Sequence, residues 1–388
     1  MHHLWLVLIA VFAVANSAQA QIKGSGSTFA AQLYSSWSQT LTKSASEGVA
    51  YEPSGSTAGV KAIQDRSADF GASDTPLTRA ALDQASLIQF PTAIGGVVIL
   101  TNIPGIGSDK IKLDGNVLAE IYAGRIKLWN DPALKLLNPE LSLPATPIVP
   151  IFRDSGSGTS NIFTAYLSKV SPAFKTAIGV TSNLKLAYGK GGKTSTDMTK
   201  LLQSTAGSVT YLDYAFAADL GLPMVQLKNQ WGKFVSPNPE SLQLAMRSAD
   251  WEKLIIDQNP TFEMDLTDAG CPGCWPIASA TYVLVSTKGK ADMGLRVLDF
   301  FDQAFRLGDA AATKEGYVPL PSRAKSIISL SMRRWNDSME RAGGSKPRKR
   351  VGAFKESDLA QTNYDYDAIF FITNSSINTP ATEDFIKF

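Results

Sequence analysis

The sequence predicts an α/β protein of two domains, and two observations support this prediction. The chain has 388 residues, a length typical of two domains rather than one. Three segments also repeat one pattern, in which a short β-prone run leads through a glycine- and serine-rich loop into a run with helical spacing. Repeated strand–loop–helix units are typical of α/β folds.

The three repeats have closely similar loops. The first repeat passes from Ile22-Lys23 into a helical run with apolar residues at Leu33, Tyr34, Trp37 and Leu41, and Ser27 or Thr28 is expected to cap that helix. The second strand-like run begins at residue 49, and the third at residue 148. The loops read "GSGSTF" at 24–29, "SGSTAG" at 54–59 and "SGSGTS" at 155–160.

Each loop brings glycine backbone and hydroxyl groups to a predicted helix N-terminus. The first N–H groups of a helix have no internal partner, and the helix dipole is positive there, so such a loop suits an anion. Helix capping alone would explain any single loop of this kind. Three loops, one of them beginning two residues after Arg153, favour an anion site over capping.

The N-terminus has the features of a secretory signal peptide. An apolar run from Leu4 to Ala15 is followed by the small-x-small sequence Ala18-Gln19-Ala20. The run is too short to favour a membrane span, although the start carries no Lys or Arg. We therefore expect residues 1–20 to be removed and the mature chain to begin at Gln21, outside the cytosol.

The composition excludes several classes of function. The only histidines are His2 and His3, so the mature chain has none, which excludes a Ser-His-Asp arrangement and nearly all catalytic zinc sites. We expect no cofactor and no metal. A net charge of +2 gives no reason to expect nucleic acid as a partner. Cys271 and Cys274 form "CPGC", which in a secreted chain is expected to be a local disulfide, whereas in a cytosolic chain it would suggest a redox motif.

Beyond these patterns, long segments resemble one known family. The chain is similar, from about Lys23 to Trp335, to the periplasmic phosphate-binding proteins of the high-affinity phosphate ABC transporter (the phosphate-binding PstS family). The segments that carry the resemblance, in order, are "GSGSTFAAQLY", "GSTAGVKAI", "ADFGASDTPL", "FPTAIGGVVILTNIPG", "LAEIYAGRIKLWNDP", "RDSGSGTSNIFTAYL" and "CWPIASATYVLV".

The resemblance implies a two-lobed periplasmic binding protein (type II) fold with a ligand cleft between the lobes. Residues 21–100 and 277–335 would form the first lobe, and 101–276 the second. Chain crossings near Thr101 and Ser279 would form the hinge strands. Residues 342–388 would be a C-terminal extension of unknown role, beginning with a flexible basic linker.

The resemblance also implies a set of phosphate ligands. The first lobe would contribute hydrogen-bond donors and one carboxylate acceptor, Asp74, and the second lobe would contribute one cation, Arg153, with further donors. Asp74 has an alternative role as the cap of a helix beginning near Leu77, since "SDTPL" also fits a helix start. The implied ligands are Thr28, Phe29, Ser56, Asp74, Arg153, Ser157, Gly158 and Thr159.

One position departs from the family pattern. The family has an acidic residue two places after the arginine, where it can pair with that arginine, and here this place is Ser155. The neighbouring Asp154 is not expected to replace it, because adjacent side chains on extended backbone point to opposite sides. The sequence therefore does not identify the side chain that pairs with Arg153.

The function implied by the resemblance is binding rather than catalysis. A monomeric periplasmic protein would capture inorganic phosphate and deliver it to a membrane ABC permease. Three alternatives remain: a binding protein for another tetrahedral oxyanion, such as sulfate or molybdate; a secreted phosphate-handling enzyme, such as a phosphatase; and a surface protein that uses this fold for adhesion or signalling.

Overall fold

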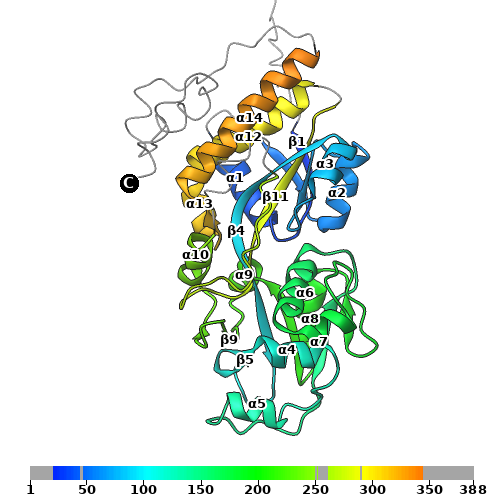
Figure 1. The fold of residues 1–388 in the computed structure, drawn as a ribbon, viewed down its shortest axis with the longest axis vertical. Helices are drawn as coiled ribbons and strands as arrows, with labels where there is room; N and C mark the ends of the chain where they lie inside the picture. The colour runs from blue at the N-terminus through cyan, green and yellow to red at the C-terminus, as the bar shows by residue number, and fades with distance from the viewer. Residues whose placement is uncertain (1–20, 44–46, 250, 252–260, 289–290, 344–388) are drawn as a thin grey trace, which may run out of the picture.

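The computed structural model describes residues 21–43, 47–249, 251, 261–288 and 291–343. The predicted signal peptide at 1–20 and the extension from residue 344 lie outside the described residues. Figure 1 shows two lobes, one above the other, with strand β4 running from one lobe into the other. This arrangement agrees with the predicted two-lobed α/β fold.

The first lobe is built on a mixed sheet. The first two predicted strand-like runs, β1 and β2, pair in parallel, and β1 also pairs in parallel with β3. The returning strand β11 is antiparallel to both β3 and β4, and β12 pairs with β4. The bounds are β2 Val49–Glu52, β1 Ile22–Gly26, β3 Phe70–Ser73, β11 Ala278–Ser286, β4 Leu87–Asn102 and β12 Val318–Pro319.

Helices cover this sheet, and an aromatic cluster fills the space beneath α1 and α12. Tyr34 and Trp37, on the apolar face predicted for α1, lie against Phe301 of α12, and Tyr34 also contacts Phe70 of β3. Such edge-to-face contacts of buried rings stabilise the lobe beyond the area they bury. The helices are α1 Ala31–Thr42, α2 Ser56–Gln64, α3 Arg79–Ala85, α12 Ala291–Leu307, α13 Asp309–Lys314 and α14 Ser322–Gly343.

The predicted cap of the first helix is wrong. The helix begins at Ala31, and its N-cap position is Ala30, which makes no side-chain cap. The hydroxyl of Ser27 instead donates to Asp74 and accepts the N–H of Phe29. A contact with a residue distant in the sequence therefore outcompetes the local capping role.

Strand β4 belongs to both lobes. Its residues from Leu87 to Gly96 pair with β11, whereas those from Val97 to Asn102 pair with β8 of the second lobe. The returning chain lies beside this point, because the indole N–H of Trp275 donates to the carbonyl oxygen of Val97 at 2.9 Å. The pairing partner of β4 therefore changes nearer to Gly96 than to Thr101.

The second lobe repeats the strand–loop–helix pattern around parallel strands. β8 and β7 each pair in parallel with β6, and a small separate sheet has the order β10-β9-β5. The strands are β5 Lys112–Asp114, β6 Val149–Arg153, β7 Lys190–Gly192, β8 Ser208–Asp213, β9 Gln226–Lys228 and β10 Phe234–Val235. The helices are η1 Ser108–Lys110, α4 Gly115–Tyr122, α5 Pro132–Leu137, α6 Gly158–Val170, α7 Pro172–Ala177, α8 Ser195–Ser204 and α9 Tyr214–Asp219. Although α10 Pro239–Arg247 follows these elements in the chain, it packs against β4, β11 and β12 and lies beside α13 in Figure 1.

The third repeat folds as its spacing predicted. Strand β6 leads through the serine-rich loop into α6, whose apolar residues Ile162, Phe163, Tyr166 and Leu167 are buried. The ring of Phe163 stacks on Tyr211 of β8 with centroids 4.2 Å apart. This packing holds the N-terminus of α6 against the carboxyl ends of β6 and β8.

At the other end of the chain, α14 continues to Gly343. Ala342 and Gly343, which we expected to begin a flexible linker, are therefore helical, because the amphipathic helix continues past Trp335. No helix in the described part of the chain is both long enough and apolar enough to cross a membrane.

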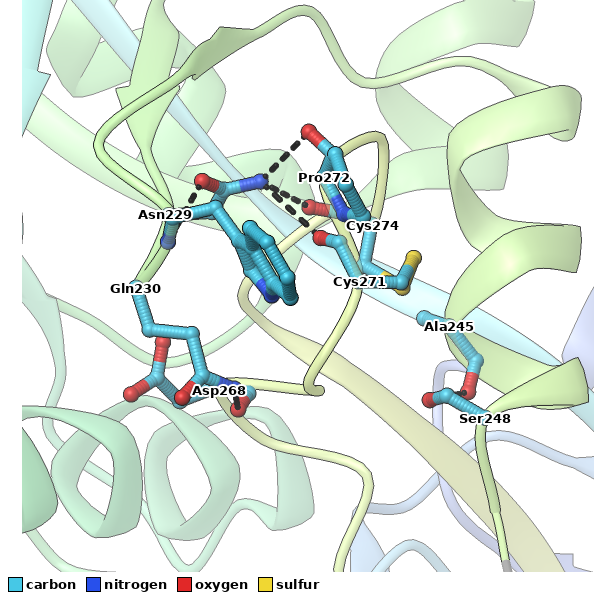
Figure 2. Close-up of a disulfide and its surroundings, with 9 residues drawn as sticks. Asn229, Gln230, Ala245, Ser248, Asp268, Cys271, Pro272 and Cys274 are labelled. Atoms are coloured by element: carbon cyan, nitrogen blue, oxygen red, sulfur yellow. Dashed lines mark hydrogen bonds between the residues drawn. A yellow bond between two sulfur atoms is a disulfide. The ribbon is translucent and has the colours of Figure 1, made fainter.

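A disulfide joins Cys271 and Cys274 in a turn of the second lobe. The side-chain amide of Asn229 donates to the carbonyl oxygens of Pro272 at 2.9 Å, Cys271 at 3.3 Å and Cys274 at 3.4 Å, as Figure 2 shows. Because one side-chain amide is hydrogen-bonded to three carbonyl oxygens of the turn, hydrogen bonds stabilise the turn in addition to the disulfide.

Candidate functional site

Asp74 lies buried directly after β3, with 2% of its surface exposed. Its Oδ1 accepts a hydrogen bond from the hydroxyl of Ser27 at 2.5 Å, and its Oδ2 accepts one from Ser56 at 3.2 Å. The alternative role of Asp74 as a helix cap is wrong, because α3 begins at Arg79 and is capped by Thr78. Asp74 is therefore a buried acceptor held by two hydroxyl donors.

Burial raises the pKa of Asp74 to about 6, against the opposing effects of the hydrogen bonds from Ser27 and Ser56 and of the positive charge of Arg153. At neutral pH the group is therefore ionised and can only accept hydrogen bonds. Because its pKa lies close to neutrality, it is also a strong acceptor for a partner that carries its own proton.

The first loop reaches Asp74 through a close backbone approach. Gly26 has a φ of 142°, and a Cβ there would lie 2.1 Å from the carbonyl oxygen of Ala72. Only glycine fits at this position. The approach brings Ser27 beside Asp74, a role that sequence reasoning missed because it considered Ser27 only as a helix cap.

The two predicted ligands of this loop lie next to Ser27. The N–H of Phe29 donates to the Ser27 hydroxyl at 3.0 Å, and the carbonyl oxygen of Phe29 accepts a hydrogen bond from Tyr317. Thr28 is partly exposed, and its hydroxyl makes no hydrogen bond to any described residue. Thr28 is thus available to an additional partner, whereas the Phe29 amide is already engaged.

Arg153 is the last residue of β6 and is 3% exposed. Its Nε donates to the carbonyl oxygen of Lys193 at 2.6 Å and to the hydroxyl of Ser155 at 3.1 Å. Burial lowers the pKa of the guanidinium from its usual value, yet the group stays charged at any physiological pH. Neither Nη1 nor Nη2 has a hydrogen-bond partner within the described ranges.

Arg153 forms no ion pair in the part of the chain that the structure describes. Ser155, at the position where the family resemblance implied an acid, offers only a hydroxyl, and that hydroxyl donates in turn to the carbonyl oxygen of Lys193 at 2.9 Å. Asp154 lies against Gly191, whose added Cβ would be 2.9 Å from the Asp154 carboxylate. Asp154 therefore does not replace the missing acid, as the alternation of side chains predicted.

Ser157, Gly158 and Thr159 form the beginning of α6 and are all buried. Ser157 caps the helix, since its hydroxyl accepts the N–H of Ser160 at 3.3 Å. Because this helix has thirteen residues, its first turn presents N–H groups that lack an internal partner and a positive dipole end.

The two lobes meet at these helix N-termini. A Cβ on Gly158 would lie 2.3 Å from Oγ of Ser56 and 2.4 Å from Oδ2 of Asp74. A Cβ on Gly55 would lie 2.7 Å from the carbonyl oxygen of Gly156 and 3.8 Å from Nη2 of Arg153. The structure therefore brings Ser56, Asp74, Arg153 and Gly158 together, although they come from three separate segments of the chain.

A second buried carboxylate lies at this junction, and sequence reasoning missed it. Asp213 ends β8 and caps α9, with Oδ1 accepting the N–H of Phe216 at 2.9 Å. Its Oδ2 is buried without a hydrogen-bond partner among the described residues. The only signal in the sequence was a helix-cap pattern in "YLDYAF", which says nothing about nearness to Arg153.

The arrangement combines one guanidinium, one acceptor carboxylate, several hydroxyls and the N-termini of α2 and α6. This set can bind an anion that also carries a proton. The described residues contain no cluster of His, Cys, Asp and Glu suited to a metal ion.

Comparison with known proteins gives one consistent result. The family model described as "PBP superfamily domain" matches residues 13–303. The phosphate-binding protein PstS of Pasteurella multocida is 36% identical over 88% of this chain and 97% of its own length. The protein of the same name from Haemophilus influenzae is 37% identical over 85% of this chain and 95% of its own.

Solved structures agree on the fold. A high-affinity periplasmic phosphate-binding protein, PfluDING, solved with bound phosphate, has a TM-score of 0.62 at 24% identity, covering 80% of this chain and 94% of its own. The family model and the two relatives above show that the chain belongs to the PstS family of phosphate-binding proteins, within the PBP superfamily.

Proposed function

We propose that this chain is an extracytoplasmic solute-binding protein that captures inorganic phosphate and delivers it to the permease of an ABC transporter. The observation that carries the proposal is the meeting of Asp74 and Arg153 at the contact between the lobes, where Gly158 lies directly against the Asp74 carboxylate. The family supports the same function, because two relatives that this chain matches over nearly their whole length are named phosphate-binding proteins.

In this proposal both lobes supply ligands. Arg153 donates a forked pair of hydrogen bonds from its terminal nitrogens, and the N-terminus of α6 donates through the main chain of Gly158 and Thr159 and the hydroxyl groups of Ser157 and Thr159. The first lobe donates from Thr28, the Phe29 amide and Ser56. The Phe29 N–H must exchange its present contact with Ser27 for one with the ligand.

Asp74 is proposed to select phosphate over sulfate. Both anions are tetrahedral, but at neutral pH phosphate keeps at least one proton and sulfate keeps none. An ionised carboxylate accepts that proton in a hydrogen bond, whereas sulfate would place lone pairs and like charge against it. Sites built around such a bond reject the analogue that lacks the proton by roughly 10⁴–10⁵.

Ligand binding would shift the balance between open and closed arrangements of the lobes, as is general for periplasmic binding proteins. The closed arrangement would be the form that a membrane permease recognises. A periplasmic location and a monomeric state complete the proposal, and the predicted signal peptide supports the location.

Calorimetry on the purified mature protein tests the proposal. We expect wild type to bind phosphate and arsenate and to reject sulfate, and Asp74→Asn to lose most of this discrimination. Asp69→Asn is the control, because Asp69 immediately precedes β3, at the opposite end from Asp74, and accepts the main-chain N–H of Lys23. Equal affinity of wild type for phosphate and sulfate would contradict the role of Asp74, and phosphate release from an ester would support the phosphatase alternative.

A further inference from the structure

Sheet pairing places Asp213 beside Arg153. Strands β6 and β8 are parallel neighbours, and Arg153 is the last residue of β6 as Asp213 is the last residue of β8. The N–H of Arg153 donates to the hydroxyl of Tyr211, two residues before Asp213, at 3.2 Å. Because the carboxyl ends of parallel strands meet at one edge of the sheet, both side chains belong to the edge where open α/β sheets bind ligands.

Asp213 is almost fully buried, at 2% exposed, and only one of its oxygens has a role in the fold. Oδ1 caps α9, while Oδ2 has no partner within the described ranges. A helix cap needs one oxygen, so capping does not account for the second. With little water nearby to screen it, a charge on this carboxylate is felt strongly by its neighbours.

The groups that act on Asp213 come from several elements. Its charge interacts with Asp74, which follows β3, and with Arg153 on β6, and it acts in turn on Tyr317, which precedes β12. The other ionisable side chains near Asp213 are Tyr211 on its own strand β8 and Tyr214 on α9, the helix that it caps. Strand β4, which pairs with Asp213 at Val97, carries no ionisable side chain. The charges around Asp213 are therefore those of the proposed phosphate site itself.

We propose that Asp213 is a further specificity-determining residue of this site: it gives Arg153 the counter-charge that Ser155 does not provide, and it takes up a proton when phosphate binds. This inference rests on the proposed function. The proton comes from solvent and ends on the carboxyl group of Asp213, and no bond of the phosphate is made or broken.

The physical reason is the charge balance of the site. Without ligand, the guanidinium of Arg153 shares the site with two buried carboxylates, Asp74 and Asp213, and Asp154 and Asp197 act on it as well. Phosphate adds at least one further negative charge. Protonation of one carboxylate relieves this repulsion. Burial raises the pKa of Asp213 to about 7, with the charge of Asp74 acting in the same direction, so protonation costs little near neutral pH. Asp74, with a pKa of about 6 and hydroxyl donors on both oxygens, is the better group to remain ionised.

Phosphate calorimetry at pH 6, pH 7.5 and pH 8.5, in two buffers of different ionisation enthalpy at each pH, measures both affinity and proton uptake. The variants are Asp213→Asn and, as a matched control, Asp114→Asn. Asp114 caps α4 through the N–H of Val117 at 2.8 Å in the same geometry, but it lies outside the site. The titration of phosphate itself is common to all three proteins and cancels in the comparison.

We expect wild type and Asp114→Asn to take up a fraction of a proton more than Asp213→Asn at pH 7–8. Asp213→Asn should bind phosphate more tightly than wild type at high pH, because it lacks the negative charge that repels the ligand. The ratio of the two affinities should grow by about tenfold between pH 6 and pH 8.5, as linkage requires for one coupled proton. Asp213→Glu should restore the pH dependence. If Asp213→Asn does not fold, Asp213→Ser tests the same point, because serine caps helices without a charge.

The outcomes separate the two proposals. Wild type that binds no phosphate contradicts the proposed function. Wild type and Asp213→Asn that bind phosphate with the same pH profile and the same proton uptake overturn the role of Asp213 and leave the proposed function intact.

Discussion

The main chain of Gly158, at the start of α6, lies against the carboxylate of Asp74, which belongs to the other lobe. A Cβ on Gly158 would stand 2.4 Å from Oδ2 of Asp74 and 2.3 Å from Oγ of Ser56. The two halves of the proposed site are thus joined by a contact that only a glycine permits.

Gly158→Ala should therefore weaken phosphate binding by at least about tenfold, because the added methyl group keeps the lobes from closing on the ligand. The fold itself should tolerate the change, since alanine favours the first turn of a helix over glycine. Calorimetry measures the affinity and thermal unfolding the stability. Gly270→Ala is the control, as its Cβ would meet only Nε2 of Gln230 at 3.4 Å; an unchanged affinity in Gly158→Ala would contradict closure at this contact.

Arg153→Ala should cost more phosphate affinity than Thr28→Ala. A hydrogen bond from a charged donor is worth roughly 1.5–3 kcal/mol and one from a neutral hydroxyl about 1 kcal/mol. Arg153 also offers two terminal nitrogens, neither of which has a protein acceptor among the described residues. Titration of both variants with phosphate checks the ranking, and equal losses would show that the guanidinium does not contact the ligand.

Ligand-free protein should lose stability as pH rises from about 4 to about 7, in part through Asp213. The pKa of this buried carboxyl is raised from 3.8 to about 7, so the folded state holds a proton that the unfolded state releases. The free energy of unfolding therefore falls across that pH range. Above it, the folded state carries the whole destabilisation caused by burying the charged carboxylate. The free energy of unfolding of Asp213→Asn, measured relative to that of wild type, should rise by on the order of 2–4 kcal/mol between pH 4 and pH 8.

Urea unfolding of wild type, Asp213→Asn and the capping control Asp114→Asn at the two pH values measures this difference. A gain of the same size in Asp114→Asn would attribute the effect to helix capping instead of burial.

The disulfide should contribute little to stability and nothing to phosphate affinity. It closes a loop of only a few residues, for which chain entropy predicts about 2 kcal/mol at most, and Asn229 already holds the carbonyls of the turn. Cys271→Ser with Cys274→Ser should therefore bind phosphate like wild type. Mass spectrometry of unreduced protein checks the link itself, and two free thiols or a bound zinc would contradict it.

The sequence by itself determined the local secondary structure and the residue types of the predicted phosphate ligands. The strand–loop–helix spacing predicted α6, whose residues Ile162, Phe163, Tyr166 and Leu167 are buried, and it placed the serine-rich loop at the helix N-terminus. Ser157 was expected there as a phosphate ligand, and the structure adds that it caps the helix. The helix and its loop could be predicted because helical periodicity and helix-start signals depend on residues within a few positions of one another. The departure at Ser155 was also visible, and with it the question of what balances Arg153.

Only the tertiary structure decided which distant groups meet. It assigned the hydroxyl of Ser27 to Asp74 instead of to a helix cap, and it divided β4 between the two lobes near Gly96. It also placed Asp213 beside Arg153, where the sequence shows only a capping aspartate. These contacts join residues about fifty or more positions apart. They follow from sheet pairing and close backbone approach, which no local pattern records.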